Sequence, residues 1–145
     1  MPDMYRRARI LWSLAASGLG TTISAAGNSG AWGGTGPGDI LPEADFETPV
    51  DLRDIADVAL FVHVGAVTSS PAFLVQLDLF DDAGNLYLQV LKTASLSAAG
   101  SAAPVYAGLH GGAASSYLLP PSWGRVSWTC TGGTVTGTDI TLYGR

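Results

Sequence analysis

The side chains best suited to act as bases, nucleophiles or metal ligands are few and scattered in this sequence. The chain has two histidines, His63 and His110, and one cysteine, Cys130. No second histidine or cysteine stands at metal-ligand spacing from either histidine. The GxSxG pattern of serine hydrolases is also absent. We therefore predict that the protein is not an enzyme and has no catalytic residue, no metal site and no cofactor.

Three aspartates form the strongest alternative set of ligands. Asp78, Asp81 and Asp82 carry oxygens of the kind that calcium accepts, but their spacing is not that of an EF-hand. The DDAGN segment at residues 81–85 is also typical of a tight turn, because glycine and asparagine tolerate positive φ. The turn is the preferred interpretation, and cation binding by these aspartates stays open as an alternative.

Arginine and tryptophan side chains are the candidates for binding a partner. Three arginines stand close together near the N-terminus, and aromatic side chains recur along the chain. Aromatic faces on a β-sandwich can stack on sugars, but packing in the core or at an interface is the preferred interpretation. Trp128 is expected in the core. The candidate partner-binding residues are Arg6, Arg7, Arg9, Trp12, Trp32 and Trp123.

The composition limits the kinds of partner. The chain has 145 residues, enough for one domain, and 47% of them are hydrophobic. Only 13% are charged, against about 25% in an average globular protein, which fits a surface partly covered by partners. A net charge of -5 argues against nucleic acid as the main ligand. The apolar stretch at residues 10–19 is shorter than the ~18 residues of a membrane span, so no membrane insertion is expected.

The chain changes character near residue 50. Residues 17–39 are rich in Gly, Ser and Thr, which makes a packed helix there unfavourable. Acidic residues then accumulate as far as Asp57. We therefore predict an extended, Gly-rich N-terminal arm with an acidic flank at residues 1–50, followed by a β-sandwich domain at residues 51–145.

Alternating side chains predict strands in the second part. Residues 57–67 are apolar on both sides, which is typical of a central, buried strand, so His63 is expected to be packed and hydrogen-bonded. Residues 72–93 predict a hairpin, with Gln76 and Asp78 on the face opposite the apolar side chains.

The remaining segments also indicate short strands separated by turns. Residues 94–104 predict a small-residue loop, and TGGTVTG at residues 131–137 predicts a turn. Between them, residues 123–130 alternate: Val126, Trp128 and Cys130 are expected to face inward, and Arg125, Ser127 and Thr129 outward. Short strands at this spacing predict an all-β fold, an antiparallel β-sandwich or jelly-roll-like domain.

Three segments carry a resemblance to a known family: DVALFVHVGAVTSSPAFLVQLDLFDDAGN, the loop LKTASLSAAGSA, and WGRVSWTCTGGTVTGTDITLYGR. Together they cover about residues 55–145, and they resemble small β-sandwich virion proteins of tailed bacteriophages. The resemblance implies a non-enzymatic structural protein, made in the host cytoplasm and located in the virion. It favours a capsid decoration (cement) protein, with a tail or head–tail connector subunit as the alternative. The implied partners are the major capsid protein, other virion subunits and further copies of this chain. From a different class, a carbohydrate-binding β-sandwich module remains the other alternative.

Overall fold

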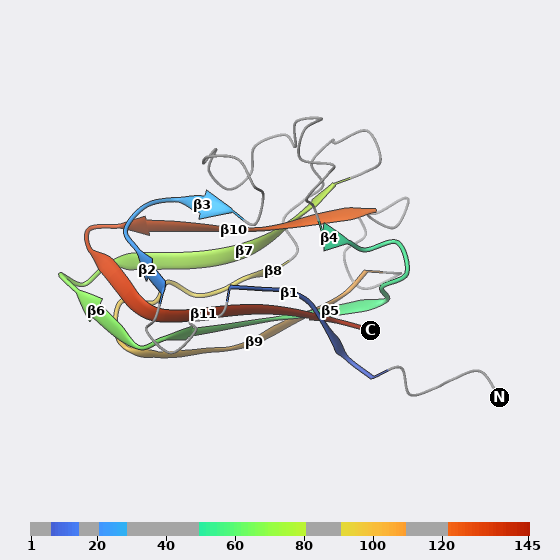
Figure 1. Ribbon diagram of the computed structural model, residues 1–145, viewed down its shortest axis with the longest axis horizontal. Helices are drawn as coiled ribbons and strands as arrows, with labels where there is room; N and C mark the ends of the chain where they lie inside the picture. Colours follow the sequence, from blue (N-terminus) through green and yellow to red (C-terminus); the bar gives the residue numbers. More distant parts are fainter. Residues whose placement is uncertain (1–6, 15–20, 29–49, 81–90, 110–121) are drawn as a thin grey trace.

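Two antiparallel β-sheets stack on each other in the computed structural model of the protein (Figure 1). The structure describes residues 7–14, 21–28, 50–80, 91–109 and 122–145, and every structural statement below refers to these residues. They contain strands and no helix. The predicted all-β class and the sandwich-like arrangement are therefore confirmed.

The first sheet, called sheet 1, has β11 as its central strand. β1 and β2 pair with one side of β11, β5 and β6 pair with the other, and β9 pairs with β5. β5 and β6 are separated only by Gly65, whose N–H donates to the carbonyl oxygens of Thr136 at 3.0 Å and Gly137 at 3.1 Å. The strands of sheet 1 are β1 (Arg9–Leu14), β2 (Thr21–Ile23), β5 (Asp57–Val64), β6 (Ala66–Thr68), β9 (Gly100–Gly108) and β11 (Thr134–Gly144).

The second sheet, called sheet 2, is built on the pair β7 and β10. These strands run antiparallel in unbroken register from Trp123↔Phe80 to Thr131↔Ala72. β8 pairs with β7 through Gln76↔Lys92, which confirms the predicted hairpin pairing; the predicted turn at residues 81–85 lies outside the described residues. The strands of sheet 2 are β3 (Gly27–Asn28), β4 (Val50–Asp51), β7 (Ala72–Phe80), β8 (Leu91–Lys92) and β10 (Trp123–Thr131).

Two sharp connections carry the chain between the sheets. β6 leads to β7 through Ser69 and Ser70, which have positive φ values of 63° and 50°. β10 leads to β11 through Gly132, with φ of 76°, and Gly133. A side chain on Gly133 would collide with the backbone carbonyl oxygen of Thr68, so this corner requires glycine. The predicted turn at residues 131–137 is therefore shorter than expected, because Thr134 already begins β11.

The hydrophobic core lies between the two sheets. Alternate side chains of β5, β7 and β11 point into it, as the period-two pattern predicts. Val126 and Cys130 of β10 are buried there as expected, and Trp128 packs against its edge. Burial raises the pKa of the Cys130 thiol. The core side chains of these three strands are Val58, Leu60, Val62, Val64, Phe73, Val75, Leu77, Leu79, Val135, Ile140 and Leu142.

The predicted burial of β5 on both sides is wrong. β5 is central in its sheet, between β11 and β9, but only its inward face is buried. On the other face Phe61 and His63 are exposed, so His63 is not a packed core histidine. The apolar run at residues 57–67 suggested burial on both faces because Phe61 stands on the exposed face, where a strand with one solvated face normally has a polar residue.

The expected exposure of Arg125 and Ser127 is also wrong. Both lie on the outer face of sheet 2, opposite Val126, yet they are only 1% and 0% exposed. The predicted loop at residues 94–104 is shorter than expected as well, because β9 begins at Gly100.

The N-terminal strands pair with the C-terminal ones. β1 and β2 pair with β11, and β3 and β4 pair with β10. The described parts of residues 1–50 therefore supply strands to the same two sheets as the rest of the chain.

Candidate functional site

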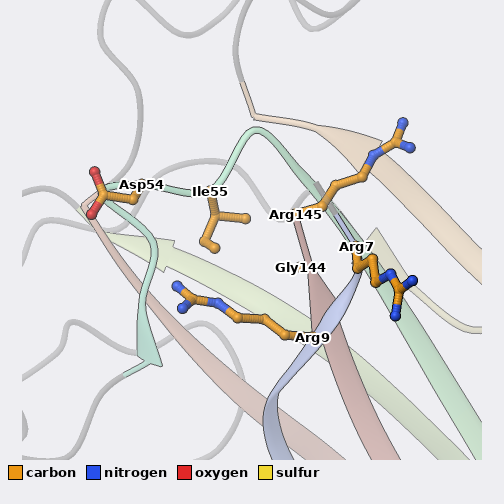
Figure 2. Close-up of a pocket in the computed structure, with 6 residues that line it drawn as sticks. All are labelled: Arg7, Arg9, Asp54, Ile55, Gly144 and Arg145. Carbon is orange, nitrogen blue, oxygen red and sulfur yellow. The ribbon is translucent and has the colours of Figure 1, made fainter. Parts of the chain in front are cut away.

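An open pocket of about 490 Å³ lies at one end of sheet 1 (Figure 2). It forms where the start of β1, the end of β11 and the turn between β4 and β5 meet. Its lining carries three arginines and one aspartate, so it is a cationic site on a chain of net charge -5. Two of the predicted partner-binding residues, Arg7 and Arg9, belong to it. The lining residues are Arg7, Arg9, Asp54, Ile55, Gly144 and Arg145.

Backbone pairing positions the arginines. Arg9 stands opposite Gly144 in the β1–β11 register, and the backbone N–H and C=O groups of Arg145 bond to Asp57 and Ala56. Gly144 lets Leu11 and Ile55 pack closely against the end of β11, because a Cβ there would lie 2.5 Å from the side chain of Leu11 and 3.0 Å from that of Ile55. The pocket is therefore built on strand ends that are fixed by hydrogen bonds.

The ion pairs around the pocket are exposed. Arg145 Nε lies 2.9 Å from Asp57 Oδ2, and Arg53 Nη2 lies 2.6 Å from Asp51 Oδ2. The side-chain hydrogen bond from Arg53 lowers the pKa of Asp51, and the positive charge of Arg9 adds to that effect. No hydrogen bond or salt bridge joins Arg9 to another of the described residues. Its guanidinium group is therefore available to an acidic partner.

The three guanidinium groups do not converge. Figure 2 shows the side chain of Arg9 extending toward Ile55, whereas Arg7 and Arg145 project on the other side of the two strands. Tight binding of one small anion uses donors that meet at a single point, as in a bidentate arginine–carboxylate pair. The spread of charge in this pocket instead suits several acidic groups on an extended surface.

The two described tryptophan candidates do not present open aromatic faces. Trp123 is half-buried, and the guanidinium carbon of Arg53 lies 4.7 Å from its ring centroid. Trp12 stacks on Trp128, with ring centroids 6.4 Å apart and an interplanar angle of 26°. Neither tryptophan joins the pocket residues, and the remaining candidates, Arg6 and Trp32, lie outside the described residues.

Asp78, a candidate cation ligand, is already engaged on the outer face of sheet 2. Its carboxylate accepts hydrogen bonds from Gln76 Nε2 at 2.8 Å, Ser127 Oγ at 2.7 Å and Arg125 Nη2 at 3.3 Å. Asp81 and Asp82 lie outside the described residues. Within the ranges that the structure describes, no three His, Cys, Asp or Glu side chains gather as a metal site would require.

The sequence interpretation missed an exposed patch on the outer face of sheet 1. Ile10 is 58% exposed and Phe61 is 42% exposed. The ring of Phe61 packs edge-on against Tyr143, with centroids 5.5 Å apart and an angle of 78°. The alternation of β5 carried the signal, because Phe61 falls on the same side of the strand as Asp57 and His63.

No protein-family model and no curated protein matches this chain. In the described part of the chain, no helix is long and apolar enough to cross a membrane.

Proposed function

We propose that this chain is a non-enzymatic structural protein of a phage particle, a capsid decoration protein that binds the shell through its N-terminal arm. In this proposal the two sheets form a jelly-roll-like domain, and the N-terminal arm contacts a neighbouring subunit at Arg7 and Arg9, where it leads into β1, while β1 itself stays paired with β11. The observation that supports it most is the placement of Arg7 and Arg9 beside Arg145, in an open cationic pocket at the start of the first strand.

Charge favours this mode of attachment. The chain is acidic overall, so an acidic shell surface would be repelled by most of the molecule and attracted at this pocket. The protein would then bind with the end that carries Arg7, Arg9 and Arg145 facing the shell. Many copies on one lattice gain avidity, so each contact need contribute only modest free energy.

The test is the occupancy of purified phage particles, measured by quantitative mass spectrometry against the major capsid protein. Hundreds of copies are expected for a decoration protein, whereas a handful would identify a tail or connector subunit. The paired change Arg7→Glu and Arg9→Glu should lower occupancy at least tenfold. Lys92→Glu, a single exposed reversal of charge on β8 outside the pocket, is the control for Arg9→Glu alone and should leave occupancy unchanged. Absence of the wild-type chain from the particles would refute the proposal.

A further inference from the structure

The outer face of sheet 1 carries a continuous apolar centre. The register places Ile10 beside Tyr143 and Tyr143 beside Ala59, across β1, β11 and β5. Phe61 lies next along β5, packed against the ring of Tyr143. We call Ile10, Ala59, Phe61 and Tyr143 the apolar face. Two of its four side chains are among the large hydrophobic residues that the sandwich leaves exposed.

The chemistry of the apolar face excludes two kinds of occupant. Its centre has no charged side chain, so it offers nothing to a strongly acidic or basic surface. The rings of Phe61 and Tyr143 meet at 78°, so they do not form the flat platform on which a sugar ring stacks. An uncharged protein surface with interdigitating side chains is the occupant that fits.

Charge is confined to the two ends of this sheet face. Arg7 and the Arg145–Asp57 pair lie at one end. Asp139 stands beside His63 at the other end, in the β11–β5 register. Asp139 and Arg145 are six positions apart along β11, which corresponds to roughly 20 Å at ~3.4 Å per residue. The face is therefore basic at one end, apolar in the middle and acidic at the other end.

We infer that two copies of this chain associate through the apolar face, about a two-fold axis that lies in the interface and runs perpendicular to the strands. This axis reverses the strand direction of the second copy, so Arg7 of each copy meets Asp139 of its partner. A two-fold axis parallel to the strands would instead bring Arg7 onto Arg7. The apolar face is self-complementary in the first arrangement, as a two-fold dimer requires.

The size of the face predicts a weak dimer. Three strands at ~4.8 Å and six residues at ~3.4 Å give a footprint of roughly 300 Å², less than half of the ~800 Å² per partner of a standard interface. We therefore expect a dissociation constant in the micromolar range or weaker. Self-association would then be governed by local concentration, which is high wherever copies are held side by side.

Sedimentation velocity of the isolated full-length protein over a wide concentration range tests the inference. The wild type should shift reversibly from monomer to dimer. Phe61→Glu places two like charges at the centre of the interface and should raise the dissociation constant at least 50-fold. Ser97→Glu adds the same charge at an exposed position outside sheet 1 and should leave it unchanged.

Charge exchange tests the orientation. Arg7→Asp and Asp139→Arg should each raise the dissociation constant about 3- to 10-fold, since two exposed ion pairs are lost per dimer. The double variant should return it to within about twofold of the wild type. If the dimer of the double variant had a higher dissociation constant than that of either single variant, the antiparallel arrangement would be overturned.

A wild type that stays monomeric at millimolar concentration would overturn the whole inference, whether the face then binds a glycan or another protein. The result does not depend on attachment to a particle, because it is measured on the isolated protein. Failure of the dimer is therefore distinguishable from failure of the proposed function.

Discussion

The outer faces of the two sheets differ sharply in exposure, although both carry aromatic and polar side chains. On sheet 2, Asp78, Phe80 and Ser127 are fully buried, and Arg125 is 1% exposed. On sheet 1, the outward-facing Phe61 is 42% exposed. Hydrophobic residues are usually the buried ones and charged residues the exposed ones. Here the charged pair is covered and the phenylalanine is open, so residue type alone does not tell which face of a sandwich is covered.

On the buried outer face of sheet 2, the carboxylate of Asp78 accepts hydrogen bonds from three side chains. Removing two charges from water carries a large desolvation cost, which good geometry and additional hydrogen bonds must offset. Asp78 has those bonds, from Gln76, Ser127 and Arg125, and the Arg125 guanidinium carbon also lies 5.2 Å from the ring centroid of Phe80. The exposed outer face of sheet 1 has no buried carboxylate of this kind, so substitutions there should affect stability less. This contrast leads to four predictions.

The largest effect is expected from Asp78→Ala. This change leaves the Arg125 cation buried without its carboxylate, and breaking a buried pair costs ~3–5 kcal/mol. Urea unfolding followed by tryptophan fluorescence should show that loss in the free energy of unfolding. Asp51→Ala removes a carboxylate from the exposed pair with Arg53 and should cost less than ~1 kcal/mol. If both variants lost the same free energy of unfolding, burial of the Asp78–Arg125 pair would not make it more important for stability than an exposed pair.

An intermediate effect is expected from Ser127→Ala. The hydroxyl donates to Asp78 Oδ2 at 2.7 Å. The variant removes this donor, so the buried carboxylate has one hydrogen bond fewer. The expected cost is ~1–3 kcal/mol in the same unfolding experiment. Thr141→Ala, on the outer face of sheet 1, is the matched control and should change stability by no more than ~0.5 kcal/mol.

The sequence predicted the inward faces of these sheets and not the outward ones. Val75 and Leu77 on β7, or Ile140 and Leu142 on β11, alternate with other residues because their partners in the core lie directly opposite. Arg125 follows the same alternation, but its burial depends on what covers the outer face of sheet 2. A period of two shows which side chains share a face of the strand, and it carries no information about whether the outer face is exposed.

The sequence also could not show which distant residues meet at the candidate site. Arg7 and Arg9 were predicted as a basic cluster, but the sequence placed Arg145 at the opposite end of the chain. The three meet only because β1 pairs with β11. None of the strands β1 to β4 was predicted: β2, β3 and β4 have only two or three residues, too few to show a period, and β1 lies in the segment that was predicted as an extended arm.

A small effect on stability is expected from Phe61→Ser. The ring is partly exposed, so its removal from the folded monomer costs about 1 kcal/mol or less, well below the cost of truncating a buried phenylalanine. Phe73→Ser, at a fully buried position of β7, is the comparison and should cost more than ~3 kcal/mol. Both free energies should be measured at low protein concentration, where dimerisation does not contribute. A large loss for Phe61→Ser would contradict the view that the outer face of sheet 1 is open in the monomer.

The smallest effect concerns pH and the exposed pair. The hydrogen bond from Arg53 lowers the pKa of Asp51 below its ordinary value of 3.8. A carboxyl with a depressed folded-state pKa contributes stability above its unfolded-state value and loses it as the pH falls through the folded-state value. Asp51 is exposed, so the contribution is screened and stays within the ~0–1 kcal/mol of surface pairs. Wild type and Asp51→Asn should therefore differ slightly at pH 7, and the difference should shrink as the pH is lowered below 3.8. A difference that grows on acidification would show that the carboxylate is not stabilised by Arg53, and that the pair beside Trp123 forms for another reason.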